Sequence, residues 1–155
     1  MTDQLKQKNI PNHVAFIMDG NRRWAVKRSI PIIEGHKMGS KVIKKIVRKG
    51  MKLKIKYLTF YGFSTENWNR KPQEIRALQE LLNFYLDNEK ENFIRNKINF
   101  SFIGNLNKFS KDIIAKLTNF KRITQNFSNL YFVLALGYGS RSEILDAVNN
   151  IALSK

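Results

Sequence analysis

The sequence predicts an α/β fold in which helices flank a largely parallel central sheet, in a single domain over residues 1–155. Two observations carry this prediction. Short apolar runs typical of buried strands alternate four times with longer segments whose apolar residues recur at helical spacing. No internal repeat and no linker rich in Pro, Gly or Ser divides the chain, and 155 residues suit one domain of common size.

Four strand–helix units follow one another along the chain. Pro72 suits the first turn of the second helix, because its fixed φ is compatible with a helix start. Ser140 and Glu143 have the spacing of a capping box, which predicts the start of the last helix. In chain order, we expect strands at 14–18, 57–61, 98–102 and 130–136, and helices at about 39–49, 73–93, 113–123 and 140–151.

Composition excludes several kinds of site and suggests the charge of a partner. The chain has no cysteine, so disulfides and thiolate sites are excluded, and two histidines cannot form a multi-histidine metal cage. The net charge of +16 favours an anionic partner: nucleic acid, an anionic membrane surface or a phosphorylated small molecule. No run approaches the ~18 apolar residues of a membrane span, and the N-terminus has no secretory pattern. We therefore expect a cytoplasmic protein, with peripheral membrane contact left open.

Polar and aromatic residues gather in two segments, each of which follows a predicted strand. The first is DGNRRW at 19–24, and the second is GFSTENWNR at 62–70. In parallel sheets, ligands bind outside the carboxyl ends of the strands. Both segments are therefore expected at the same edge of the sheet, where they would form one site.

The first segment places a carboxylate, a glycine and two arginines close together. Gly20 allows the backbone to approach a ligand, and Arg22 and Arg23 can each donate two hydrogen bonds to a phosphate group. A carboxylate beside phosphate usually requires a divalent cation, so Asp19, diphosphate oxygens and waters would form a Mg²⁺ site. A surface turn with solvated arginines is an equal alternative. The glycine pattern matches neither a Walker A loop nor G-x-G-x-x-G, which disfavours ATP and dinucleotides.

The second segment offers Ser64, Asn67 and Arg70 as polar groups, with Phe63 and Trp68 as apolar walls. The alternative is a helix start capped by a hydroxyl, with both aromatic rings in the core, and the spacing alone favours this alternative.

A histidine lies just before the first predicted helix. His36 follows a glycine there, and a lone histidine in this position more often forms a structural hydrogen bond than acts as a catalyst. No role is assigned to His13.

Five motifs, taken together, resemble the ordered signatures of the cis-prenyltransferases. The similarity covers about residues 10–153 and is greatest to the bacterial undecaprenyl diphosphate synthases, which are also called isoprenyl transferases. The motifs are IPNHVAFIMDGNRRWA at 10–25, GHK at 35–37, FSTENWNR at 63–70, FIGN at 102–105 and ALGYGSR at 135–141.

The resemblance implies a reaction and a set of site residues. An allylic diphosphate, typically farnesyl diphosphate, would lose its diphosphate as isopentenyl diphosphate attacks, building a cis-polyprenyl diphosphate for lipid carrier synthesis. Asp19 would be the carboxylate associated with Mg²⁺. Asn67 matches the position of the family's proton acceptor, but a neutral amide is a poor base, so we expect it to be a positioning or relay group. The residues implied to bind substrate are Gly20, Asn21, Arg22, Arg23, Trp24, His36, Ser64, Thr65, Glu66, Trp68 and Arg70.

The long helix at 73–93 has two implied roles. It carries Glu74, which matches a family glutamate beside the site, and its apolar stripe would wall a tunnel for the growing chain.

Three departures from the family pattern are visible. Ile32 stands where the family usually has an arginine that helps to hold diphosphate, and Gly137 and Ser140 differ from the usual segment. The chain also ends before the family's later strands, its arginine–serine cluster for isopentenyl diphosphate and a second metal-binding glutamate. We therefore expect a C-terminally shortened domain whose condensation activity is near background.

Two other functions stay open beside the transferase. One is a non-catalytic subunit that binds prenyl diphosphate, and the other is a basic α/β domain that binds nucleic acid. The second would need basic residues concentrated on one face, and the chain has no nucleic-acid-binding signature, so a nucleic-acid partner is disfavoured. The family is typically homodimeric, so a homodimer is expected if the fold is complete.

Overall fold

A computed structural model describes residues 10–154 of the chain. The described part contains four strands, five α-helices and one short 3-10 helix. In chain order they are β1 (His13–Ile17), α1 (Asn21–Val26), α2 (Ile32–Lys52), β2 (Tyr57–Ser64), η2 (Thr65–Asn69), α3 (Pro72–Arg95), β3 (Ile98–Ile103), α4 (Lys111–Thr124), β4 (Leu130–Tyr138) and α5 (Ser140–Leu153).

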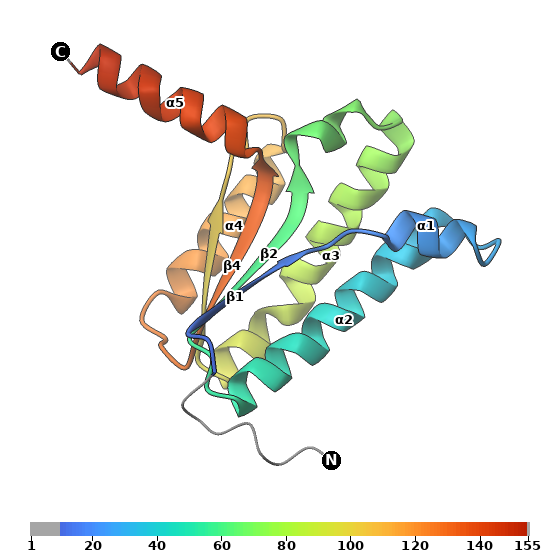
Figure 1. Cartoon of the computed structure of the whole chain (residues 1–155). Helices are drawn as coiled ribbons and strands as arrows, with labels where there is room; N and C mark the ends of the chain where they lie inside the picture. Colours follow the sequence, from blue (N-terminus) through green and yellow to red (C-terminus); the bar gives the residue numbers. More distant parts are fainter. Residues whose placement is uncertain (1–9, 155) are drawn as a thin grey trace.

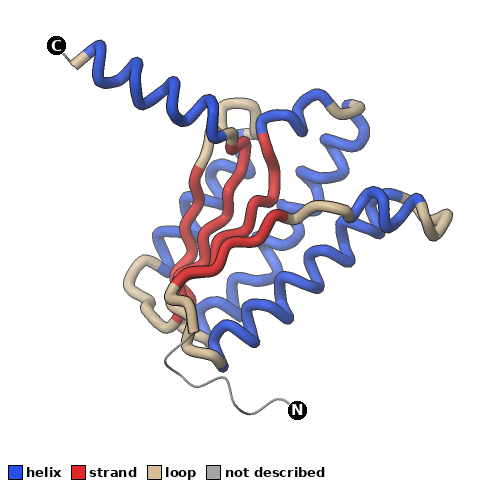
Figure 2. The backbone as a smooth tube through the Cα atoms, in the orientation of Figure 1, coloured by secondary structure: helices blue, strands red, loops and turns tan. Residues whose placement is uncertain are grey.

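The strands form one sheet in the order β1-β2-β4-β3, and every neighbouring pair is parallel. This confirms the predicted α/β class and the parallel central sheet. The helices α2, α3 and α4 connect the strands and pack on one face, with α3 between the other two (Figure 1). Figure 2 shows the strands running side by side, and because every pair is parallel their carboxyl ends lie at one edge of the sheet.

The core lies between the sheet and these helices and is rich in phenylalanine. Phe60, Phe100 and Phe132 point into it from three neighbouring strands and are at most 6% exposed. Phe100 stacks on Phe120 of α4 with 4.5 Å between ring centroids, and Phe93 of α3 lies edge-on to Phe132 at 5.2 Å. These phenylalanine rings therefore pack the sheet against α3 and α4.

The opposite face of the sheet has a different character. His13, Tyr57 and Tyr131 lie next to one another on it, with ring centroids 5.8 and 4.8 Å apart. Ile17 is 80% exposed, so the expectation of a buried first strand is wrong. β1 lies at the edge of the sheet and only its alternate residues face the helices, which a short unbroken apolar run does not reveal.

The helices near the predicted site differ most from expectation. α2 begins at Ile32 instead of near residue 39, so His36 lies within the helix and not before it. Its first turns carry Gly35 and Gly39, which are buried, and they therefore lack the apolar repeat used to find the helix. α1 lies in the first polar segment and is not predicted as a helix, because its six residues are too few to show a period.

β2 also continues further than expected. It runs through Gly62 to Ser64 instead of closing at Gly62, and its register against β4 shifts on either side of Phe63. A Cβ on Gly62 would lie 3.1 Å from a methyl group of Leu134, so this glycine serves close strand packing and not chain reversal.

The last helix exists as predicted, but its predicted cap is wrong. Gly139 is the N-cap residue and no side chain caps the helix, so Ser140 and Glu143 form no capping box. Glu143 instead accepts a hydrogen bond of 2.7 Å from the hydroxyl of Tyr138, a partner that only the end of β4 provides. α5 points away from the sheet (Figure 1), and Ile144, Leu145, Val148, Ile151 and Leu153 on it are exposed. Within residues 10–154, no helix combines the length and the hydropathy needed to cross a membrane.

Candidate functional site

The two polar segments meet at the carboxyl edge of the sheet, as the sequence predicts. β1 and β2 are parallel neighbours, and the N–H of Met18 still donates to the carbonyl of Tyr61 at 3.3 Å just beyond the paired residues. The segment at 19–24 therefore leaves the sheet beside the segment at 62–70.

The first segment turns sharply from β1 into α1 at a glycine. Gly20 has φ +83°, a left-handed conformation that costs other residues energy, and its carbonyl accepts from the N–H of Trp24 at 2.9 Å. Asp19 is 74% exposed, and its Oδ1 accepts from the N–H of Gly20 while its Oδ2 accepts from Arg23 at 2.9 Å. Arg23 is thus turned toward the carboxylate, and Arg22 is turned the other way, toward α3.

Close packing holds α1 against α2. The amide of Asn21 donates to the carbonyl of Met18 at 3.3 Å, and a Cβ on Gly39 would lie 2.8 Å from that amide. A Cβ on Gly35 would overlap the backbone of Asn21. The apolar pattern does not reveal this role of Gly35 and Gly39, although two glycines four residues apart on one helix face are a signal of close approach.

A rigid turn positions the second segment. The N–H of Ser64 donates to Oδ1 of Asn67 at 3.0 Å, and the Ser64 side chain accepts in return from the backbone of η2, which forms a capping box. Trp68 lies edge-on to Phe63 and Phe109 at 4.7 and 4.9 Å. The structure thus places these aromatic rings in packing contacts, as the structural alternative for this segment predicted.

The remaining residues of this turn are nearer to solvent. Glu66 is exposed, and a hydrogen bond from the Ser64 hydroxyl, followed by one from its own backbone N–H, lowers the pKa of its carboxyl. A Cβ on Gly139 would lie 2.5 Å from the hydroxyl of Thr65, so the chain just after β4 packs closely against the turn. On the other segment, the guanidinium of Arg28 stacks over Trp24 at 4.3 Å from the ring centroid.

A cluster of four charged or titratable side chains joins the two segments. Glu74 near the start of α3 has its carboxylate 2.7 Å from Arg70, 3.7 Å from Arg22 and 3.8 Å from His36. Burial, and then the nearby charge of Arg70, lowers the pKa of His36, while Glu74 opposes this effect. We call Arg22, His36, Arg70 and Glu74 the charged cluster. Its residues come from α1, α2, α3 and the end of η2. Glu74 is part of this cluster, whereas the sequence predicts it only beside the site.

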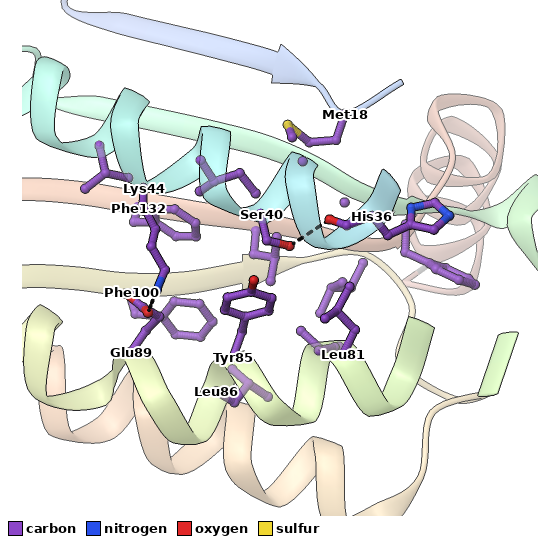
Figure 3. Close-up of a pocket in the computed structure, with 18 of the residues that line it drawn as sticks. Met18, His36, Ser40, Lys44, Leu81, Tyr85, Leu86, Glu89, Phe100 and Phe132 are labelled. Carbon is purple, nitrogen blue, oxygen red and sulfur yellow. Dashed lines mark hydrogen bonds and ion pairs between the residues drawn. The ribbon is translucent and has the colours of Figure 1, made fainter. Parts of the chain in front are cut away.

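An apolar cavity of about 270 Å³ extends from this cluster between α2, α3 and the sheet (Figure 3). His36, Asn67 and Arg70 line it at the charged end. Most of the remaining wall is apolar and includes the stripe predicted on α3, which is Leu78, Leu82, Tyr85 and Leu86. Ile43 and Val47 of α2, Phe100 of β3 and Phe132 of β4 complete this wall. Figure 3 shows His36 at one end, Tyr85 midway, and the ion pair between Lys44 and Glu89 at the other.

A second cavity of about 480 Å³ adjoins the charged cluster on its other side. Arg22, His36, Lys71 and Glu74 line it together with Ile32, the residue that replaces the usual arginine of the resemblance. Most of the rest of its wall is apolar, and His36 and Leu78 line both cavities.

The carboxylates suit a metal ion only if a ligand brings further oxygen atoms. Among residues 10–154, no group of three or more acidic or histidine side chains could hold a metal by itself. Asp19 presents an exposed carboxylate between Gly20 and Arg23. Mg²⁺ commonly binds one or two carboxylates together with substrate phosphates and waters, so this donor set fits an ion shared with a diphosphate.

The comparisons with known proteins concern the family and the fold of the chain. A family model with the description "Putative undecaprenyl diphosphate synthase" matches residues 17–155. The chain belongs to this prenyltransferase family. It is 45% identical over 146 residues to an isoprenyl transferase of Clostridium acetobutylicum, covering 94% of this chain and 57% of the relative. An isoprenyl transferase of Fusobacterium nucleatum is 42% identical, with 94% of this chain and 63% of the relative covered.

Solved structures of family members show the same fold. A lavandulyl diphosphate synthase from Lavandula x intermedia, in complex with dimethylallyl diphosphate, superposes with a TM-score of 0.88 at 32% identity, covering 92% of this chain and 61% of that one. A probable undecaprenyl diphosphate synthase from Campylobacter jejuni gives a TM-score of 0.77 at 32% identity, covering 94% and 63%. The chain thus spans about three fifths of the length of these relatives.

Proposed function

We propose that the protein is an isoprenyl transferase that condenses isopentenyl diphosphate with an allylic diphosphate of farnesyl type. The observation that carries the proposal is the charged cluster at the entrance of the apolar cavity. Two arginines and a histidine converge on one point, and apolar side chains of α2 and α3 continue from it. A prenyl diphosphate has the same division, with an anionic head and a hydrocarbon chain.

The diphosphate head would lie between the first segment and the charged cluster. Arg22 and Arg23 would donate charge-assisted hydrogen bonds to its oxygens, and the left-handed turn at Gly20 sets the direction in which both side chains leave the backbone. When bound, Mg²⁺ would neutralise the charge that develops on the departing diphosphate, and Asp19 would hold it. Trp24, stacked on Arg28, would close the outer side of this region.

Asn67 and its turn would position the second substrate. In the condensation, the bond between the allylic carbon and its diphosphate oxygen breaks, a carbon–carbon bond forms to isopentenyl diphosphate, and the product loses one proton. Oδ1 of Asn67 accepts the N–H of Ser64, so the amide is held in a fixed place at the cavity entrance. A neutral amide is a poor base, so its proposed role is to orient the proton-losing carbon or to relay the proton. Thr65, Glu66 and Trp68 would support this turn.

The finer biological role belongs to the same proposal. Cis-polyprenyl diphosphates are membrane lipids, so a role in lipid carrier synthesis, a cytoplasmic location and peripheral membrane contact would follow from the reaction. The family resemblance also suggests a homodimer. A non-catalytic subunit that binds prenyl diphosphate is the second candidate, because binding alone needs only the charged cluster and the apolar cavity.

Calorimetry with farnesyl diphosphate and farnesol tests the binding half of the proposal. The diphosphate should bind more tightly than the alcohol, because only it can pair with Arg22, Arg23 and Arg70. Equal affinity for the two would remove the support for a diphosphate site.

An assay with radiolabelled isopentenyl diphosphate, farnesyl diphosphate and Mg²⁺ then separates the two candidates. Incorporation of label into longer prenyl products, lost in Asp19→Asn, assigns the transferase. Tight binding of farnesyl diphosphate without incorporation assigns the binding subunit.

A further inference from the structure

Glu74 lies where a substrate anion would be expected. Its side chain is only 12% exposed, and its two oxygens face Arg70, Arg22 and His36, which come from three different elements. The side chain of Arg22 is 56% exposed and that of Arg70 is 28% exposed, so solvent screens the mutual repulsion of the two guanidinium groups only in part. A carboxylate at their centre therefore stabilises the cluster.

One carboxylate does not satisfy the whole cluster. The 2.7 Å contact with Arg70 is a hydrogen bond, whereas the contacts with Arg22 at 3.7 Å and His36 at 3.8 Å are too long to be hydrogen bonds. Nε2 of His36 is buried and has no hydrogen-bond partner among the described residues. Buried polar groups normally have partners, and an anion in the second cavity, which Arg22, His36 and Glu74 line, could supply the missing one.

We propose that Glu74 is a built-in counter-anion that holds Arg22, His36 and Arg70 together in the free protein and gives them up when diphosphate binds. The inference rests on the proposed diphosphate site and adds a determinant of its affinity. A diphosphate carries more charge and more acceptor oxygens than Glu74, so it can pair with the arginines directly. Glu74 thus acts as a positioning residue in the free protein and as a competitor during binding.

The two effects of Glu74 can be measured separately, because removing its charge should lower the stability of the free protein and raise its affinity for diphosphate. Glu74→Gln keeps the size and an acceptor oxygen of the side chain but removes its charge. The free protein should become less stable, since the arginines lose their partner. Inorganic diphosphate should bind more tightly, on the order of tenfold, since a nearby like charge no longer opposes it.

Glu89 offers a matched control on the same helix. Its side chain is 16% exposed and forms an ion pair with Lys44 at 2.5 Å, but it lies at the far end of the apolar cavity. Glu89→Gln makes the same change in net charge at similar burial, so it accounts for the general attraction of a more basic protein for anions. Glu74→Asp keeps the charge and shortens the side chain, so it accounts for loss of packing.

The test is calorimetric titration of the whole chain and the three variants with inorganic diphosphate, together with melting curves with and without it. We expect tighter binding and a larger stabilisation by diphosphate in Glu74→Gln only, with Glu89→Gln within about twofold of the unaltered chain. Weaker binding in Glu74→Gln, or equal tightening in Glu89→Gln or Glu74→Asp, would overturn the inference. If the unaltered chain binds neither inorganic nor farnesyl diphosphate, the proposed function itself fails. Titration of the unaltered chain alone shows this, so the two failures can be told apart.

Discussion

The charged cluster and the apolar cavity that extends from it are built in opposite ways. The charged cluster is assembled from side chains of four elements, one of them the left-turning entry into α1, and depends on distances of a few ångströms. The apolar cavity is lined by repeating positions of two long helices and by sheet residues such as Phe100. Polar recognition is directional and hydrophobic burial is not, so the charged cluster should be sensitive to single changes and the apolar cavity more tolerant.

Loss of the first-segment arginines should have the largest effect. Arg22→Ala with Arg23→Ala should remove most of the preference for farnesyl diphosphate over farnesol, because each charge-assisted hydrogen bond contributes about 1.5–3 kcal/mol. Calorimetry with both ligands measures the preference. Lys41→Ala with Lys45→Ala removes the same charge from exposed positions of α2 and should keep it. A similar loss in both double variants would mean that general charge, and not the placement of Arg22 and Arg23, attracts the diphosphate.

Chain length should reveal the contribution of the apolar cavity. Affinity should rise from geranyl to farnesyl diphosphate, with about 0.8 kcal/mol for each buried CH₂ as an upper guide. Leu82→Asn, in the cavity wall, should reduce this gain, whereas Leu145→Asn on the exposed face of α5 should not. Calorimetry with the two ligands gives the difference, and equal affinities in the unaltered chain would contradict the role of the cavity.

The left-handed turn at Gly20, which leads into α1, should make the stability of the protein sensitive to substitution there. Gly20→Ala should destabilise the protein by about 1–2 kcal/mol, because an alanine is disfavoured at φ +83°. Gly20→Asn should cost less, since asparagine tolerates the left-handed region better. Denaturant unfolding of both variants measures the cost. An alanine variant as stable as the unaltered chain would show that the turn can relax without strain.

The smallest expected effect concerns His36 and pH. Burial and Arg70 lower the pKa of His36 in the folded protein, so the unfolded chain binds the proton more readily. The free energy of unfolding should therefore fall as pH drops below the ordinary imidazole value of 6.5. In His36→Gln this part of the pH dependence should disappear, while His13→Gln should retain it. Melting curves between about pH 7 and 5 would show the difference, and parallel curves for all three proteins would contradict it.

The sequence predicted which segments meet at the candidate site, because the candidate residues lie in short, ordered segments. Asp19, Arg22 and Arg23 follow a strand directly, and the parallel sheet places Ser64 and Asn67 at the same edge. Neighbours in sequence do not reveal the direction of a side chain, however. Arg22 and Arg23 are adjacent, yet one faces Glu74 and the other faces Asp19.

By itself, the sequence determined the number, kind and order of the long elements and the edge of the sheet where the polar segments gather, because hydrophobic periodicity and short motifs are local properties of the chain. Only the tertiary structure decided that β1 is an exposed edge, that Glu143 pairs with Tyr138 instead of capping α5, and that Glu74 meets Arg22 and His36. Each of these outcomes depends on which elements pack side by side. Glu74 is 38 positions from His36 and 52 positions from Arg22 in the sequence. Contacts over such separations are formed by that packing and leave no repeating pattern in the sequence.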